Sequence, residues 1–143
     1  MTTFKTSIDI PASQEQVFAA FTDPKRMARW WGPAGFTNTF NVFEFKPGGR
    51  WSLVMHGPDG TNYPNESVFA EVEPSTKVVV AHTSEPKFRL TIILTKSAAG
   101  TTVSWAQAFE NDDIAQRIEH IVVPANDQNL QRLSDEVLGK PVS

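Results

Sequence analysis

Residues 29–36, Arg-Trp-Trp-Gly-Pro-Ala-Gly-Phe (RWWGPAGF), place two adjacent tryptophans directly before a break made of glycine and proline. The chain has only four tryptophans, so two of its largest side chains stand together where a helix must end. Consecutive helical residues point about 100° apart, so the two rings cannot face the same way. We expect one of Trp30 and Trp31 to pack into the core and the other to approach a pocket or its entrance. The sequence leaves open which does which.

The segment before this stretch predicts one strand and two short helices. Apolar and polar residues alternate from 4 to 10, which is typical of a strand, and Pro11 ends it. Ser13, with Gln16 three residues later, has the pattern of a helix capping box. The Asp-Pro pair at 23–24 predicts the N-cap and the first residue of a second short helix.

The segment after it predicts an antiparallel sheet. Residues 36–109 divide into about six extended runs, separated by turn sequences such as Lys46–Gly49 and Gly57–Gly60. No helical segment lies between these runs, so consecutive strands are expected to pair antiparallel. The large apolar residues fall on one face of the sheet, and that face needs a cover.

The last part of the chain predicts helices that supply this cover. Asn111 begins a helix that continues to about Val122, and Pro124 is expected to break it and start another helix that ends at Gly139. The element order predicts an α+β domain, in which two short helices follow the first strand and a C-terminal helix packs across a curved antiparallel sheet. If the sheet curls strongly, the helix cannot fill its concave side and a cavity remains.

Composition bounds the class of protein. A chain of 143 residues is expected to form a single domain, 1–143. Its net charge of −3 gives no electrostatic reason to expect nucleic acid or an anionic membrane as a partner. The absence of cysteine excludes disulfides and thiolate nucleophiles.

No apolar run resembles a signal peptide or a membrane span, so a cytoplasmic protein is expected. A free strand edge would allow a homodimer, which nothing in the sequence requires.

Four motifs occur in an order that is typical of one family. They are Ile10-Pro11-Ala12-Ser13 with Val17-Phe18, Trp30-Trp31-Gly32-Pro33, Pro47-Gly48-Gly49-Arg50-Trp51 and Met55-His56-Gly57-Pro58-Asp59-Gly60. The chain resembles the bacterial proteins related to the C-terminal domain of the activator of the heat-shock protein 90 ATPase, within the START-like (SRPBCC) superfamily. Ser67 stands where this family usually has glycine.

The resemblance implies the helix-grip fold, a curved sheet that holds a long C-terminal helix. The superfamily includes lipid-transfer domains and polyketide cyclases, so the resemblance implies either binding of a hydrophobic molecule or a cyclase-like reaction in the cavity. The family name also suggests stimulation of a chaperone ATPase, which we rate lowest because the accompanying N-terminal domain is missing from this chain.

The residues themselves point to no catalytic group, metal or cofactor. His56, His82 and His120 lie in three separate predicted elements, without the spacing of metal ligands, and no nucleophile motif is present. His82 shares a strand face with Val78 and Val80 and is therefore expected to point inward. Glu66 shares a strand face with Val68 and Ala70 and is the carboxylate candidate for the cavity rim, but a solvated position on an edge strand is favoured.

We expect the cavity to hold a small hydrophobic or aromatic ligand, with Tyr63 and His82 as polar anchors. Each aromatic residue taken alone also fits a core position. The candidate cavity residues are Trp30, Trp31, Trp51, Met55, Tyr63, His82, Leu90, Ile92 and Trp105.

Overall fold

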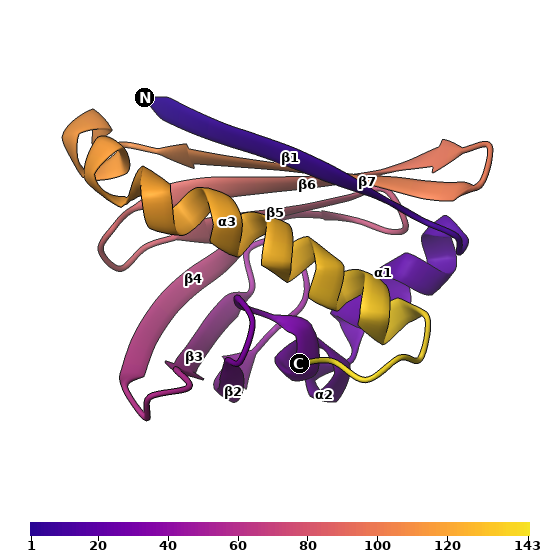
Figure 1. Cartoon of the computed structure of the whole chain (residues 1–143), viewed down its shortest axis with the longest axis horizontal. Helices are drawn as coiled ribbons and strands as arrows, with labels where there is room; N and C mark the ends of the chain where they lie inside the picture. Colours follow the sequence, from indigo (N-terminus) through magenta and orange to yellow (C-terminus); the bar gives the residue numbers. More distant parts are fainter.

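The computed structural model describes residues 1–143 and contains seven strands and three helices (Figure 1). In chain order these are β1 (Thr2–Ile10), α1 (Gln14–Thr22), α2 (Pro24–Trp30), β2 (Thr37–Phe43), β3 (Arg50–His56), β4 (Asn62–Glu73), β5 (Lys77–His82), β6 (Phe88–Ser97), β7 (Gly100–Phe109) and α3 (Asp112–Val137). The predicted α+β helix-grip class is confirmed, with two short helices after the first strand and a helix at the C-terminal end.

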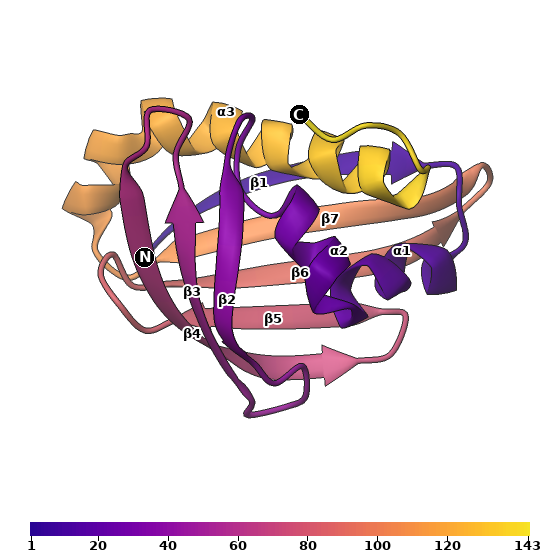
Figure 2. The ribbon, with the colours of Figure 1, turned by 90° about the horizontal axis from the view of Figure 1, so that it is seen from below.

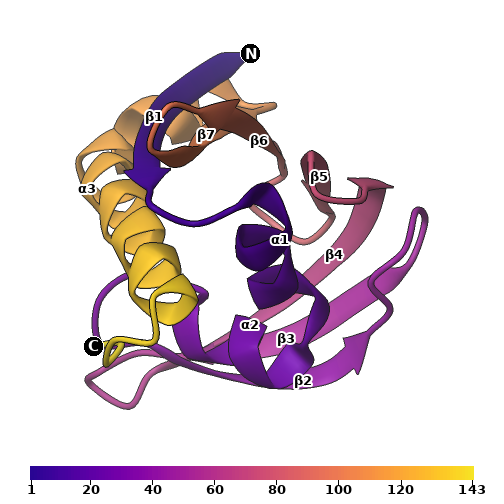
Figure 3. The same ribbon diagram turned by 90° about the vertical axis from the view of Figure 1, so that its right-hand side faces the viewer.

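All seven strands form one antiparallel sheet in the order β1-β7-β6-β5-β4-β3-β2. Only the pairing of β1 with β7 joins strands that are distant in sequence. The pairing register shifts between Phe40 and Val42 and again between Phe69 and Glu71. Such bulges add twist and bend to a sheet. The sheet accordingly curls around its concave face, which α3 crosses on the open side (Figure 3).

The two short helices begin where the sequence predicts. Ser13 accepts a hydrogen bond from the backbone N–H of Gln16, whose side chain accepts one from the backbone N–H of Ser13, so both halves of the capping box are present. Asp23 caps α2 through the N–H of Lys25, with Pro24 in the first turn. These local contacts need no tertiary partner, which is why sequence alone predicts them.

The predicted break at Pro124 is wrong. The helix α3 is continuous from Asp112 to Val137, with Pro124 inside it (Figure 2). A proline inside a helix removes one backbone hydrogen bond and costs about 3 kcal/mol. Packing just beyond Pro124 offsets this cost: Asp127 accepts a hydrogen bond from the Thr6 hydroxyl at 2.6 Å, and Leu130 and Leu133 are buried in the core.

The core occupies the end of the concave face where α1, α2 and the C-terminal half of α3 meet. Val17, Phe21, Met27 and Trp30 are completely buried there. The rings of Phe21 and Trp30 meet edge to face, with their centroids 4.9 Å apart. The N-terminal half of α3 is packed less densely, since Ile121 and Val123 remain 59% and 41% exposed. The sheet and this half of α3 leave the space described next.

Candidate functional site

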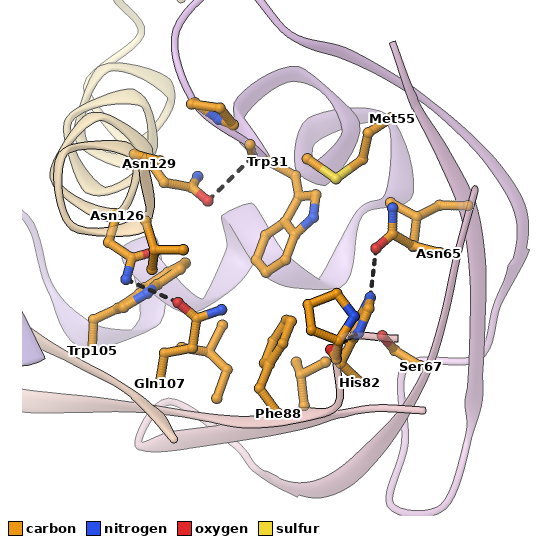
Figure 4. Close-up of a pocket in the computed structure, with 18 of the residues that line it drawn as sticks. Trp31, Met55, Asn65, Ser67, His82, Phe88, Trp105, Gln107, Asn126 and Asn129 are labelled. Carbon is orange, nitrogen blue, oxygen red and sulfur yellow. Dashed lines mark hydrogen bonds between the residues drawn. The ribbon is translucent and has the colours of Figure 1, made fainter. Parts of the chain in front are cut away.

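A cavity of about 220 Å³ lies between the concave face of the sheet and α3 (Figure 4). Ile121 belongs to its lining and is 59% exposed, so the cavity reaches the surface beside it. The lining consists of Trp31, Gly32, Pro33, Trp51, Leu53, Met55, Asn65, Ser67, Val80, His82, Pro86, Phe88, Leu90, Trp105, Gln107, Ile121, Val122, Ala125, Asn126 and Asn129.

The two adjacent tryptophans have separate roles. Trp30 is fully buried, and its indole Nε1 donates a hydrogen bond to the Ala20 carbonyl at 2.9 Å. Trp31 instead lines the cavity, where its ring contacts those of Trp51 and Trp105 at centroid distances of 4.8 and 5.9 Å. The helix ends between them, because Trp31 is the C-cap of α2 and has extended backbone angles. The change of backbone direction sends the second ring away from the core.

Two side chains of α3 hold the loop that carries Trp31. The guanidinium of Arg132 is buried and donates to five backbone carbonyls, those of residues 29, 31, 32, 33 and 36, at 2.8–3.1 Å. Asn129 accepts from the N–H of Gly32 and donates to the Trp30 carbonyl. Side-chain donors from α3 therefore replace the missing backbone partners of an irregular loop. This contact connects the sequence stretch RWWGPAGF directly to one end of the cavity.

Apolar walls make up most of the cavity. Trp51 and Leu53 from β3, Leu90 from β6 and Trp105 from β7 are buried, and Met55 lies beside them at the outer end of β3. Their side chains come from strands that are far apart in sequence and meet only because the sheet is curved. A hollow of this kind, mostly apolar with a few polar groups, is typical of a small-molecule site.

His82 is the one titratable side chain in the lining. Its Nδ1 lies 2.8 Å from the Pro86 carbonyl, its Nε2 faces the Asn65 side-chain oxygen, and its ring stacks on Phe88 at 4.4 Å. Burial lowers the pKa of His82 below its ordinary value, although the contact with the Pro86 carbonyl acts in the opposite direction. His82 is therefore neutral at neutral pH. No Asp, Glu, Lys or Arg belongs to the lining.

A second polar group lies across the cavity, on β7 and α3. Gln107 is 8% exposed, and its side-chain oxygen accepts a hydrogen bond from Asn126 Nδ2 at 3.0 Å. Figure 4 shows Gln107 and Asn126 on one side of the cavity, and Asn65, His82 and Ser67 on the other.

Six of the candidate residues from the sequence line this one cavity, and three do not. Trp31, Trp51, Met55, His82, Leu90 and Trp105 belong to the lining. Trp30 and Ile92 are buried in the core instead. Tyr63, proposed as a polar anchor, is 45% exposed at the outer end of β4, where its ring packs against Phe36 at 5.9 Å.

Of the two positions considered for Glu66, the structure shows the solvated one and not the cavity rim. Ser67 and Phe69 are the buried residues of this part of β4, so Glu66 points to the outer face. There its carboxylate accepts a hydrogen bond from the Ser52 hydroxyl and lies 3.8 Å from Arg50. The bulge after Phe69 changes the phase of the strand, and an alternation pattern extended across a bulge assigns the wrong face.

Sequence reasoning missed the amide and hydroxyl groups of the lining, which are Asn65, Ser67, Gln107, Asn126 and Asn129. One signal was available for Gln107, because it stands between Trp105 and Phe109 in a strand that alternates in and out. The structure brings no three His, Asp or Glu side chains together as a metal site. None of its helices has both the length and the apolar character that crossing a membrane requires.

The comparisons with known proteins agree with this fold. The family model described as "Activator of Hsp90 ATPase homolog 1-like protein" matches residues 11–137. The chain therefore belongs to the family of activator of Hsp90 ATPase homolog 1-like proteins, and its fold is the START (SRPBCC) helix-grip type. No curated protein matches.

Solved structures of other bacterial proteins share the fold at low sequence identity. A protein from Nitrosomonas europaea has a TM-score of 0.85 at 16% identity, with 96% of this chain and 94% of that chain covered. A protein from Chromobacterium violaceum has a TM-score of 0.82 at 22% identity, over 94% of this chain and 96% of the other. The AHSA1-like protein from Aeromonas hydrophila has a TM-score of 0.75 at 20% identity, over 96% and 93%. At such identities the likeness extends to the fold alone.

Proposed function

We propose that this protein binds a small hydrophobic or aromatic molecule in the cavity between the sheet and α3. The observation that carries the proposal is the cavity itself, about 220 Å³ in size, with Trp31, Trp51 and Trp105 among its walls. Burying an apolar ring against such walls is favourable by roughly 25 cal/mol for each Å² removed from water. The helix-grip fold supports the same proposal, because it leaves a hollow beneath its long helix.

The volume bounds the size of the ligand. An apolar cavity of about 150 Å³ is large enough for benzene. Sites for drug-sized molecules usually exceed about 300 Å³. At about 220 Å³ the cavity is suited to a molecule of one or two rings.

The alternative, a cyclase-like enzyme, has less support. Moving protons on a keto substrate requires a general acid and a general base near the reacting atoms. His82 is the only titratable side chain of the lining, and its neighbours Asn65 and Ser67 do not titrate in the ordinary pH range. The size of the cavity also favours a short ligand over a long poly-keto chain. We therefore propose binding in place of catalysis.

Filling the cavity tests the proposal. Ala125 lies in the lining on α3, so Ala125→Leu places three more carbon atoms in the hollow while keeping a good helix former. Ethylbenzene is expected to raise the melting temperature of the natural protein by about 4 °C at ten times its Kd. The Ala125→Leu variant is expected to show no such rise.

The matched control is Gln116→Leu, which adds a leucine to an exposed position of the same helix outside the lining. It should respond to ethylbenzene like the natural protein. A natural protein whose melting temperature does not change, or an equal rise in Ala125→Leu, would contradict binding in this cavity.

A further inference from the structure

The lining selects against charged ligands. None of its side chains carries a charge at neutral pH, since Asp, Glu, Lys and Arg are absent from it and burial keeps His82 neutral. A carboxylate or ammonium group inside would lose its hydration without meeting an opposite charge, which is strongly unfavourable. The ligand that fits this cavity is therefore uncharged.

Gln107 has a hydrogen-bond donor that no group of the protein uses. Its Oε1 is occupied by Asn126 Nδ2, whereas its Nε2 has no acceptor in the protein, although the residue is 8% exposed. In Figure 4 the side-chain nitrogen of Gln107 points toward the cavity, and its oxygen points toward Asn126. A ligand oxygen can accept a hydrogen bond from this amide in place of water.

The other donors of the cavity walls differ from the Gln107 amide in their access to the cavity. The indole N–H groups of Trp51 and Trp105 are both buried and neither has a hydrogen-bond partner. Asn129 uses its amide oxygen and one of its amide hydrogens within the protein, on Gly32 and Trp30. These indole groups are enclosed in the walls, whereas the amide nitrogen of Gln107 faces the cavity. This amide is therefore the donor to which a ligand oxygen can bind.

We infer that the ligand is an uncharged ring compound that carries a carbonyl-type oxygen, and that this oxygen accepts a hydrogen bond from Gln107 Nε2. The inference rests on the proposed function, since it assumes that the cavity is a binding site. It adds the chemical class of the ligand and the residue that selects it. The ring lies among the tryptophan walls, and the oxygen points to β7.

Calorimetric titration with four probes of nearly equal size tests this inference. Acetophenone offers a carbonyl oxygen, ethylbenzene has no polar group, benzoate is an anion and benzylammonium is a cation. We expect acetophenone to bind about 3- to 10-fold more tightly than ethylbenzene, which is the effect of one neutral hydrogen bond. Benzoate and benzylammonium are expected to bind at least ten-fold more weakly than ethylbenzene.

Two substitutions locate the selection at Gln107. Gln107→Met keeps the length of the side chain and removes the amide, so acetophenone should lose its advantage while ethylbenzene binds as before. Gln107→Glu introduces a carboxylate and should turn the preference toward benzylammonium. Circular dichroism verifies that each variant is folded. Ser67→Ala removes the rival hydroxyl on the opposite side of the cavity, so the comparison of the two variants shows which side selects the oxygen.

The outcomes separate this inference from the proposed function. If ethylbenzene binds but acetophenone has no advantage, or if benzoate binds equally well, the ligand class is wrong while the binding site stands. If the advantage disappears in Ser67→Ala and persists in Gln107→Met, the selecting residue is wrong. If none of the four probes binds, both the inference and the proposed function are overturned.

Discussion

At the scale of single residues, His82 is a titratable group whose surroundings differ clearly from water. It is 7% exposed, stacked on Phe88, and burial lowers its pKa. The charged group identified near it is Glu85, which acts weakly in the opposite direction. The folded protein thus resists taking up a proton at His82, whereas the unfolded chain takes one up at a pH of about 6.5.

The stability of the protein is expected to fall between pH 7.5 and pH 5.5. In this range the unfolded chain binds more protons at position 82 than the folded chain does, so the free energy of unfolding decreases as the pH falls, by up to about 1.4 kcal/mol per pH unit. Carboxylates with lowered pKa values, such as Glu136 beside Arg29, lose their contribution only at lower pH, below about 4.5.

Urea denaturation at several pH values measures this effect. His82→Gln should flatten the decrease, and His120→Gln, at an exposed position of α3, should leave it unchanged. If both variants keep the decrease of the natural protein, the assignment to His82 is wrong.

Residue-scale features divide into those that the sequence predicts and those that it does not. The caps at Ser13 and Asp23 are confirmed because each is complete within a few residues. The free amide of Gln107 and the inward hydroxyl of Ser67 were missed, because a polar residue in a strand is read as outward unless its neighbours across the sheet are known. Ser67 pairs with His82, and only that register shows that both face inward.

At the scale of elements, α3 both covers the sheet and holds the loop at the end of α2. Arg132 supplies the hydrogen bonds to that loop, while Glu136, one turn later, pairs with Arg26 and Arg29 of α2 at 3.0 and 2.7 Å. Neither contact was predicted. Both connect segments about 100 residues apart, and no local pattern carries information about such a pair.

Arg132→Met should lower the free energy of unfolding by about 3 kcal/mol or more. The substitution keeps much of the apolar stem and leaves five backbone carbonyls without their donor in a buried place. Arg117→Met, at an exposed position of the same helix, should change it by less than about 0.5 kcal/mol. Denaturation by urea compares the two, and equal losses would contradict the role of Arg132.

The error at Pro124 has its origin at the element scale. Helix propensity predicts that a helix ends at an interior proline, and this prediction is sound for an isolated segment. In the folded chain, contacts of Asp127 with β1 and of Leu130 with the core lie just beyond the proline and keep the helix in one piece. The sequence shows the cost of the proline, but not the packing that offsets it.

At the scale of the whole molecule, the sheet divides its concave side into a filled end and a hollow end. Helices α1 and α2 pack inside the curl at one end, and Trp30 belongs to that core (Figure 3). Trp31, Trp51 and Trp105 line the other end. The motifs and the element order were sufficient to predict the fold, whereas the boundary between core and cavity depends on how strongly the sheet curls, which no single segment determines.

The four tryptophans provide the most direct test of the binding cavity. Each gives one indole signal in a ¹H–¹⁵N correlation spectrum of the labelled protein, and the structure divides them into three that line the cavity and one, Trp30, that does not. Titration with ethylbenzene is predicted to shift the signals of Trp31, Trp51 and Trp105 and to leave that of Trp30 in place. Four unmoved signals, or a shift of Trp30 as large as the other three, would contradict the account.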